Sequence, residues 1–231
     1  MATFVLVHGA WHGSWCWERV VSELEGRGHR ALTVDLPIGD ASAGVDEYVK
    51  AVADVLAAAG DDPVLVAHSL SGLIAPVVAD RYPVGRVIYL GAILPAPGES
   101  LLARLEPEGV LASDYFGALE VGEDGTAPFP PDLAGDVFFG DCTPEDRAWA
   151  VSHLGRQAFT VAMAPCPVEA LPSVPTDYIV LQDDATLSPA WCRQAARDRL
   201  GVEPHELAGG HSPFITRPGE LADMLVALSG V

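Results

Sequence analysis

The sequence predicts an α/β fold in which a mostly parallel sheet of about six strands is flanked by helices. Two observations lead to this prediction. Short runs of β-branched and other apolar residues alternate with longer segments of helical period, which is the pattern of β-α-β units. In addition, 49% of the 231 residues are hydrophobic and 19% are charged, a balance that suits a chain burying one or two cores.

Strands and helices alternate without interruption through the first 90 residues. The apolar run Thr3–Val7 predicts the first strand, and a helix is expected over residues 15–25, where Gly26 and Gly28 end the apolar periodicity. The same criteria predict strands at residues 30–34, 64–67 and 86–90 and helices at residues 45–59 and 71–81. This order brings the carboxyl ends of the predicted strands to one edge of a sheet.

The pattern changes in the middle of the chain. Many prolines and broken helical periodicity between residues 95 and 173 predict an inserted cap, so that residues 1–94 and 174–231 form the core. The stretch 118–133 is expected to be the loosest part, whereas Thr143 and Pro144 predict a helix start. Regular alternation resumes with strands at 178–181 and 205–207 and helices at 190–200 and 218–228.

Charge and cysteine content limit the partners and the location. Thirteen Lys and Arg against 32 Asp and Glu give a formal net charge of −19, which excludes nucleic acid and disfavours anionic membranes as partners. No apolar run reaches the ~18 residues that a membrane helix needs. The four cysteines form no paired metal or redox motif, and no signal peptide is recognised at Met1. We therefore expect a cytoplasmic protein with reduced thiols and a small-molecule partner, with a homodimer left open.

The segment 64–72 predicts a strand, a sharp turn at Ser69 and a helix, which is the context of a nucleophile elbow. Such an elbow holds its serine in a strained conformation, so the residues two before and two after it must be small. Ala67 and Ser71 occupy these positions, followed by Gly72. The alternative is that Ser69 only caps the helix.

A nucleophilic serine needs a base, and the base needs a carboxylate that orients it. His211 is the best candidate among seven histidines because it follows the last predicted strand and the glycines Gly209 and Gly210. Asp183 and Asp184 both lie just after the strand that ends near Leu181, so either can be the acid. The resulting order of serine, acid and histidine is that of α/β-hydrolases.

The loop after the first strand, His8 to Gly13, predicts an oxyanion hole. Gly9 lets the chain turn so that the N–H of Ala10 points at the oxyanion, and the N–H of Leu70, which follows the nucleophile, supplies the second donor. A metal site at His8 and His12 is disfavoured because the spacing is not that of a helical zinc motif and no third ligand is evident. We expect neither a metal nor an organic cofactor.

Together these residues resemble the α/β-hydrolase superfamily, and within it the small group that contains plant methyl esterases and hydroxynitrile lyases. The resemblance spans nearly the whole chain through FVLVHGAWHGSW at residues 4–15, the serine turn, CTPED at 142–146 and YIVLQDDATL at 178–187. It implies the α/β-hydrolase fold with an inserted cap, Ser69 as nucleophile and His211 as base. It also implies an aspartate followed a few residues later by a proline, and Pro189 favours Asp184 over Asp183.

The resemblance also separates esterase from lyase. The lyases have a threonine at the position of Gly9 and a lysine directly after the catalytic histidine, where this chain has Ser212. Dehalogenases would need an aspartate at Ser69. The chain departs from the common pattern at Ala67 and Ser71, where glycines are usual, and in an acid loop that is one residue longer.

The sequence therefore predicts a serine hydrolase that cleaves a small to medium, largely apolar carboxylic ester through an acyl-enzyme. The alternatives are an enzyme of acyl transfer, thioester release or cyclisation with the same triad, a hydroxynitrile lyase, and a non-catalytic small-molecule-binding protein on this fold. A binding protein has no need for a strained serine. The expected substrate-binding residues are Gly9, Trp11, Phe116, Phe139, Trp149 and His153, with Phe138 and Phe159 as further wall residues. The alternative is that the aromatic residues of the cap form its own small core and that His153 faces solvent.

Overall fold

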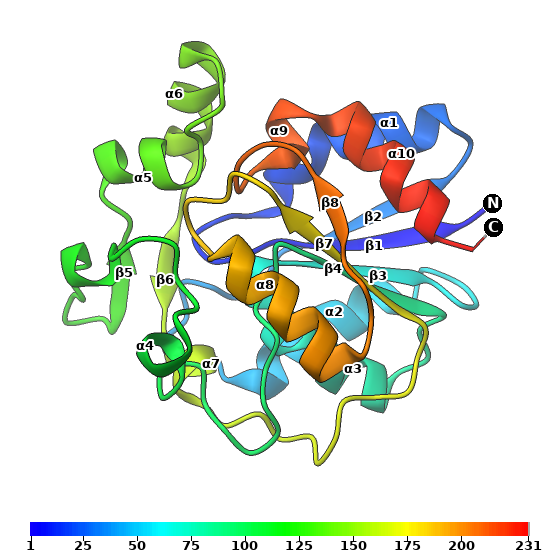
Figure 1. Cartoon of the computed structure of the whole chain (residues 1–231), viewed down its shortest axis with the longest axis horizontal. Helices are drawn as coiled ribbons and strands as arrows, with labels where there is room; N and C mark the ends of the chain where they lie inside the picture. The colour runs from blue at the N-terminus through cyan, green and yellow to red at the C-terminus, as the bar shows by residue number, and fades with distance from the viewer. Residues whose placement is uncertain (231) are drawn as a thin grey trace.

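Six parallel strands form one sheet at the centre of the computed structural model, which describes residues 1–230 (Figure 1). Their order across the sheet is β2-β1-β3-β4-β7-β8. The α/β prediction is confirmed. The strands are β1 (Thr3–Val7), β2 (Arg30–Val34), β3 (Val64–His68), β4 (Arg86–Leu90), β7 (Thr176–Leu181) and β8 (His205–Leu207).

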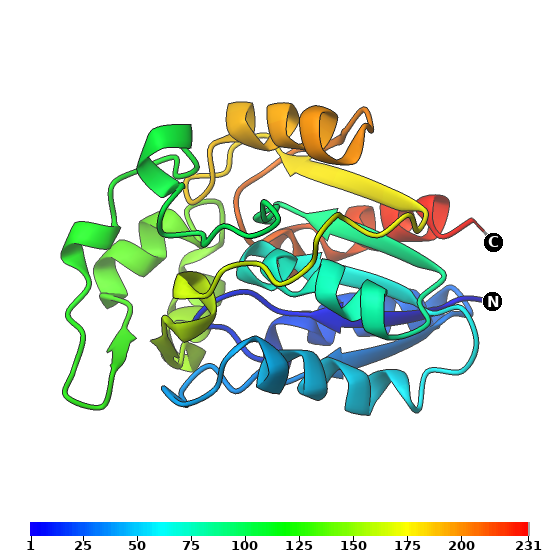
Figure 2. The same cartoon turned by 90° about the horizontal axis from the view of Figure 1, so that it is seen from below.

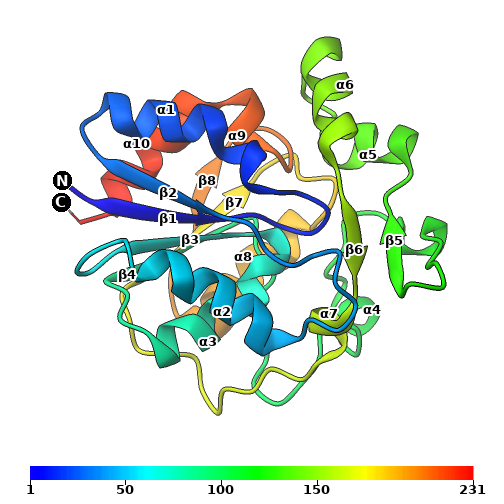
Figure 3. The ribbon, with the colours of Figure 1, turned by 180° about the vertical axis from the view of Figure 1, so that it is seen from behind.

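Helices cover both faces of the sheet, which explains why its central strands carry apolar residues toward both faces. Along β7, Ile179 and Leu181 belong to the core on one face, while Tyr178 and Val180 belong to the core on the other. One face carries α1 (Glu18–Gly26), α9 (Pro213–Thr216) and α10 (Pro218–Leu228), and the other carries α2 (Val45–Leu56), α3 (Ala75–Arg81) and α8 (Pro189–Ala195), as Figures 1 and 3 show. Within the described chain, no helix combines the length and apolar character needed to cross a bilayer.

The chain between β4 and β7 forms a cap over the carboxyl ends of the strands, at the end of the molecule away from both termini (Figure 2). Its two-stranded antiparallel sheet pairs Ala127 with Gln157. The stretch 118–133, predicted as the loosest part, contains one of these strands and the start of a helix. The cap elements are α4 (Leu105–Glu108), η3 (Phe116–Ala118), β5 (Thr126–Pro128), α5 (Pro131–Val137), α6 (Pro144–His153), β6 (Arg156–Ala158) and α7 (Thr160–Met163).

Three predicted helices differ in their first or last turns. The helix expected over 15–25 begins with the 3₁₀ turn η1 (Ser14–Trp17), and the helix expected over 190–200 ends in the wider π turn η4 (Ala196–Leu200). The helix expected over 71–81 is the 3₁₀ turn η2 (Ser69–Leu73) followed by α3. Pro76 explains this difference, because a proline has no N–H to donate to the preceding turn. The predicted cap of α6 is present, since Thr143 accepts a hydrogen bond from the Asp146 N–H.

Candidate active site

Ser69 occupies the sharp turn between β3 and η2, with a φ of +53°. A non-glycine residue in this region is strained by about 1–3 kcal/mol, and the surrounding structure must hold it there. The carbonyl oxygen of Ser69 accepts the N–H of Ile93 at 3.0 Å. Gly72 allows this close approach, because a Cβ there would lie 2.3 Å from the oxygen of Ile93. The glycine that the turn requires therefore lies three residues after the serine.

The small residues on either side of Ser69 are buried, as the elbow pattern requires. Ala67 ends the apolar part of β3, and the Ser71 hydroxyl lies 2.9 Å from the carbonyl oxygen of His68 and 3.1 Å from that of Val7. A serine is accommodated in place of the usual glycine because its hydroxyl proton finds an acceptor in one of these two carbonyls. The same contact ties the turn to the end of β1.

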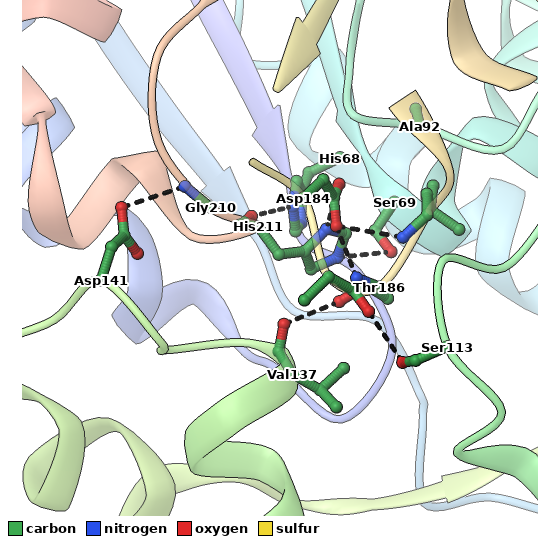
Figure 4. Close-up of polar contacts among 12 residues, drawn as sticks. His68, Ser69, Ala92, Ser113, Val137, Asp141, Asp184, Thr186, Gly210 and His211 are labelled. Carbon is green, nitrogen blue, oxygen red and sulfur yellow. Dashed lines mark hydrogen bonds and ion pairs between the residues drawn. The ribbon is translucent and has the colours of Figure 1, made fainter. Parts of the chain in front are cut away.

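A chain of hydrogen bonds joins three residues that lie far apart in sequence (Figure 4). The Ser69 hydroxyl lies 3.1 Å from His211 Nε2, and His211 Nδ1 lies 2.8 Å from Asp184 Oδ2. Because a carboxylate accepts the Nδ1 proton, Nε2 is left as an acceptor for the serine proton. All three side chains are buried. The arrangement can deprotonate Ser69 and stabilise the imidazolium that forms.

The two aspartates after β7 have different surroundings. Asp184 Oδ1 accepts the backbone N–H groups of Thr186 at 2.7 Å and Leu187 at 3.0 Å, while Oδ2 faces His211. Asp183 is exposed, and its carboxylate accepts the N–H of Gly209 at 3.3 Å. Of the two candidates, the structure places Asp184 against the histidine.

The loop that carries His211 is held from two sides. The imidazole of His68 donates from Nε2 to the backbone oxygen of His211 at 3.0 Å, and Asp141 of the cap accepts the N–H of Gly210 at 3.0 Å (Figure 4). Burial, followed by the proximity of His211, lowers the pKa of His68 well below its usual value. His68 is therefore a neutral hydrogen-bonding group beside the base.

The loop after β1 packs directly on the serine. A Cβ at Gly9 would lie 2.7 Å from Ser69 Cβ and 3.2 Å from Ser69 Oγ, so Gly9 allows the close approach. Ala10 and Leu70 line the same pocket as Ser69. Gly9, which is expected to bind substrate, is not among the residues that line the pocket. Gly9 is needed because a side chain at this position would overlap with Ser69.

His8 and His12 hold this loop through its backbone oxygens. His8 Nδ1 donates to the oxygen of Gly9 at 2.8 Å, and His12 Nδ1 donates to the oxygen of Ala10 at 2.7 Å. Burial lowers the pKa of His8 and lowers that of His12 to about 3, so both imidazoles are neutral near pH 7. Among the described residues, no group of three or more His, Cys, Asp or Glu side chains has the geometry of a metal site.

An apolar pocket opens next to Ser69, with about 510 Å³ of space between its lining atoms, part of it open to solvent. Its lining includes no charged side chain among the described residues, and Trp11 and Phe116 belong to it as predicted. The lining residues are Ala10, Trp11, Ser69, Leu70, Ile93, Leu101, Leu105, Leu111, Tyr115, Phe116, Phe138, Gln157, Ala158, Phe159, Ala162, Thr186 and Leu187.

Three predicted substrate-binding residues lie outside this pocket, and their assignments are corrected. Phe139 is fully buried behind it, with its ring centroid 5.7 Å from that of His12. The rings of Trp149 and His153 pack on the core, with centroids 5.3 and 5.4 Å from that of Trp15. These aromatic residues stabilise the contact between cap and core instead of facing a ligand.

Sequence reasoning missed the aliphatic half of the pocket and its buried amide. Leu101, Leu105 and Leu111 come from a proline- and glycine-containing segment with no clear period. Gln157 Oε1 lies 3.2 Å from the backbone N of Trp11, a contact between residues 146 positions apart. A glutamine between an arginine and an alanine in a short cap strand gives no signal of that contact.

An ion network anchors α4, the cap helix that contributes Leu105 to the pocket wall. Glu108 lies 2.6 Å from the guanidinium of Arg104 and 2.7 Å from that of Arg199, and it accepts the indole N–H of Trp191 at 3.0 Å. Hydrogen bonding from Arg104, with smaller contributions from Trp191 and Arg199, lowers the pKa of Glu108 to about 2. The network connects the cap to α8 and η4 of the core.

The geometry agrees with comparisons to known proteins. A sequence profile described as "Alpha/beta hydrolase family" matches residues 4–224. The probable esterase PIR7A of Oryza sativa is 31% identical, over 98% of this chain and 96% of its own length. The carbendazim hydrolyzing esterase of a Nocardioides species is 30% identical, over 99% of this chain and 100% of its own. The solved structure of a pyrethroid hydrolase from Sphingobium faniae matches with a TM-score of 0.84 and 26% identity, over 99% of this chain and 97% of that one.

Proposed function

The chain belongs to the alpha/beta hydrolase family, as a carboxylic ester hydrolase, and we propose that it cleaves small to medium, uncharged and largely apolar esters through an acyl-enzyme on Ser69. The observation that carries this proposal is the hydrogen-bonded series Ser69, His211 and Asp184 at the wall of an apolar pocket. In this reaction the ester supplies the acyl group and water receives it.

In the first step the Ser69 oxygen attacks the ester carbonyl carbon while His211 Nε2 takes the hydroxyl proton. The carbonyl oxygen becomes an oxyanion, which the N–H groups of Ala10 and Leu70 stabilise by about 3 kcal/mol per donor in comparable enzymes. The imidazolium then gives its proton to the departing alcohol. Water attacks the acyl-enzyme in the same way, and the acid leaves. Asp184 keeps His211 in the required tautomer throughout.

The pocket supports an uncharged substrate. Aromatic and aliphatic side chains make up most of its wall, as in most small-molecule sites. A charged ester would lose its hydration there without gaining an ionic partner. The relatives named as esterases and as hydrolases of carbendazim and pyrethroids support ester-like substrates.

The residues next to the triad disfavour lyase chemistry. Ser212, which follows His211, is fully buried and uncharged, so it offers no cation to a departing cyanide anion. A threonine side chain at Gly9 would overlap with Ser69 in the present backbone.

Four free thiols, at Cys16, Cys142, Cys166 and Cys192, support the further proposal of a cytoplasmic location, which cell fractionation tests.

The test is hydrolysis of p-nitrophenyl esters of increasing acyl length by wild type and Ser69→Ala in parallel. We expect turnover of short and medium esters that Ser69→Ala abolishes, together with stoichiometric labelling of Ser69 by a fluorophosphonate. A folded Ser69→Ala variant that keeps most of the activity would contradict the proposal. A wild type that neither turns over esters nor takes the label would point to a binding protein. Release of the free acid, without transfer of the acyl group to an added alcohol, indicates hydrolysis, whereas acyl transfer to the alcohol indicates a transferase.

A further inference from the structure

We propose that His8 and Gln157 are positioning residues of the oxyanion hole, which fix the peptide groups on the two sides of Ala10. This inference rests on the proposed function, in which the Ala10 N–H stabilises the oxyanion. Neither side chain contacts the reacting atoms through its own polar group. Each acts through a backbone hydrogen bond, His8 from the end of β1 and Gln157 from β6 of the cap.

His8 acts on the peptide group that contains the donor itself. The Ala10 N–H belongs to the peptide whose oxygen, that of Gly9, accepts the Nδ1–H of His8 at 2.8 Å. The tautomer of His8 is independently determined, because its Nε2 accepts the backbone N–H of Leu36 at 3.0 Å. His8 is fully buried and neutral. It therefore holds the plane of this peptide, and hydrogen bonding at one end of an amide strengthens donation at the other.

Gln157 acts on the next peptide group, from the cap. Its Oε1 accepts the N–H of Trp11 at 3.2 Å, and its amide orientation is determined because Nε2 donates to the hydroxyl of Tyr48 and the oxygen of Ala158. The oxygen at the other end of this peptide, that of Ala10, accepts the Nδ1–H of His12. Gln157 is 1% exposed. The second peptide is thus held at both ends by buried side chains.

The loop needs this support because its backbone is strained. Trp11 has a φ of +59°, a region that side chains other than glycine rarely adopt. Further bonds hold Trp11 from the cap, where Gly155 donates to its oxygen at 2.8 Å and Ala127 accepts its indole N–H at 3.0 Å. A relaxed loop would rotate the Ala10 N–H, which makes no hydrogen bond within residues 1–230, away from the pocket.

An oxyanion donor contributes to catalysis only when it is already aimed at the developing charge. Loosening the loop should therefore weaken transition-state binding and leave ground-state binding almost unchanged. Substitution of a residue that only stabilises the fold would lower the melting temperature without a fall in kcat at nearly unchanged KM.

The experiment compares His8→Leu, His8→Asn and Gln157→Met with wild type on a p-nitrophenyl ester. We expect kcat to fall about 10- to 100-fold in His8→Leu and about 10-fold in Gln157→Met, with KM within about threefold. The loss is smaller for Gln157 because His12 still holds the other end of the peptide. His8→Asn, whose amide can donate to Gly9, should recover part of the loss. His153→Leu, the same change at a histidine that packs on Trp15 outside the pocket, is the matched control.

The second readout is inhibition by an alkyl trifluoromethyl ketone and by the corresponding secondary alcohol. Ser69 Oγ adds to the ketone carbon, its proton passes to His211, and the ketone oxygen takes the negative charge. The inhibition constant for the ketone should rise in proportion to the loss in kcat, while that for the alcohol stays within about threefold. The inference is overturned if the folded variants keep kcat within twofold, or if both inhibitors weaken equally. Failure of wild type to react with a fluorophosphonate would instead overturn the proposed function, so the two failures are distinguishable.

Discussion

Replacing Asp184 with asparagine is expected to inactivate the enzyme by changing the tautomer of His211. The two oxygens of Asp184 have different roles: Oδ1 accepts two backbone N–H groups, from Thr186 and Leu187, and Oδ2 accepts the Nδ1–H of His211. Both backbone groups are donors, so the asparagine oxygen must replace Oδ1. Its NH₂ then faces His211 Nδ1 and donates to it. Nδ1 becomes the acceptor and the proton moves to Nε2, which can no longer receive the Ser69 proton.

The expected loss in kcat follows from the loss of His211 as general base while the geometry of the site is kept. The same change in a serine protease triad costs about 10⁴-fold in kcat, which corresponds to about 5 kcal/mol. Here the two backbone hydrogen bonds at 2.7 and 3.0 Å keep the asparagine in place, so we expect a loss of the same order. The fold should be retained, because the side chain keeps its volume and its backbone partners.

The assay is kcat on a p-nitrophenyl ester, with thermal melting as the check on folding and Asp183→Asn as the matched control. Asp183 is exposed and its carboxylate accepts one hydrogen bond among the described residues, from the N–H of Gly209 at 3.3 Å, so its variant should stay within about threefold of wild type. The reasoning is refuted if folded Asp184→Asn keeps more than about a tenth of the activity, or if Asp183→Asn loses as much.

Three further predictions concern the oxyanion loop, the anchor of α4 and the pocket wall. Gly9→Ala should lower kcat about 10- to 100-fold, because its Cβ would lie 2.7 Å from Ser69 Cβ; a kcat within twofold of wild type would contradict this. Glu108→Gln should lower the melting temperature at pH 6, and the difference from wild type should shrink at pH 3. The reason is that Arg104, with Trp191 and Arg199, depresses the pKa of Glu108 from 4.5 to about 2. The stabilisation is complete above pH 4.5 and is lost as the pH falls through 2, so a difference that grows in acid would be inconsistent. Phe116→Ala should move the preferred p-nitrophenyl ester to a longer acyl chain, because Phe116 lies between the pocket and an open groove beside α4. An unchanged preference for acyl length would argue against this position of Phe116 in the pocket wall.

Much of the core could be predicted because its strands and helices are indicated by patterns of neighbouring residues. An apolar run that ends at a glycine-containing loop predicts the strand Thr3–Val7 with its observed bounds. Small residues between a strand and a helix predict the turn at Ser69, and the structure has the required close approach at Gly72. Both signals depend on neighbours within a few positions, where backbone sterics act directly.

The cap was harder to predict because its contacts are remote in sequence and its helices are short. Trp149 and His153 share a helix whose aromatic side packs on Trp15 of the core, and neither residue reaches the pocket. Sequence pattern cannot distinguish an aromatic residue that faces a ligand from one that covers another aromatic ring, since both gain the same apolar burial.

The sequence by itself predicted the succession of strands along the chain, the serine and histidine of the candidate triad, and the loop that offers the Ala10 N–H. Only the tertiary structure decided between Asp183 and Asp184, brought Gln157 to the oxyanion loop and selected the pocket wall. The physical reason is the range of the interactions involved. Helix and strand periodicity arises from neighbouring residues, whereas a hydrogen bond across 146 positions exists only after the cap has packed on the core.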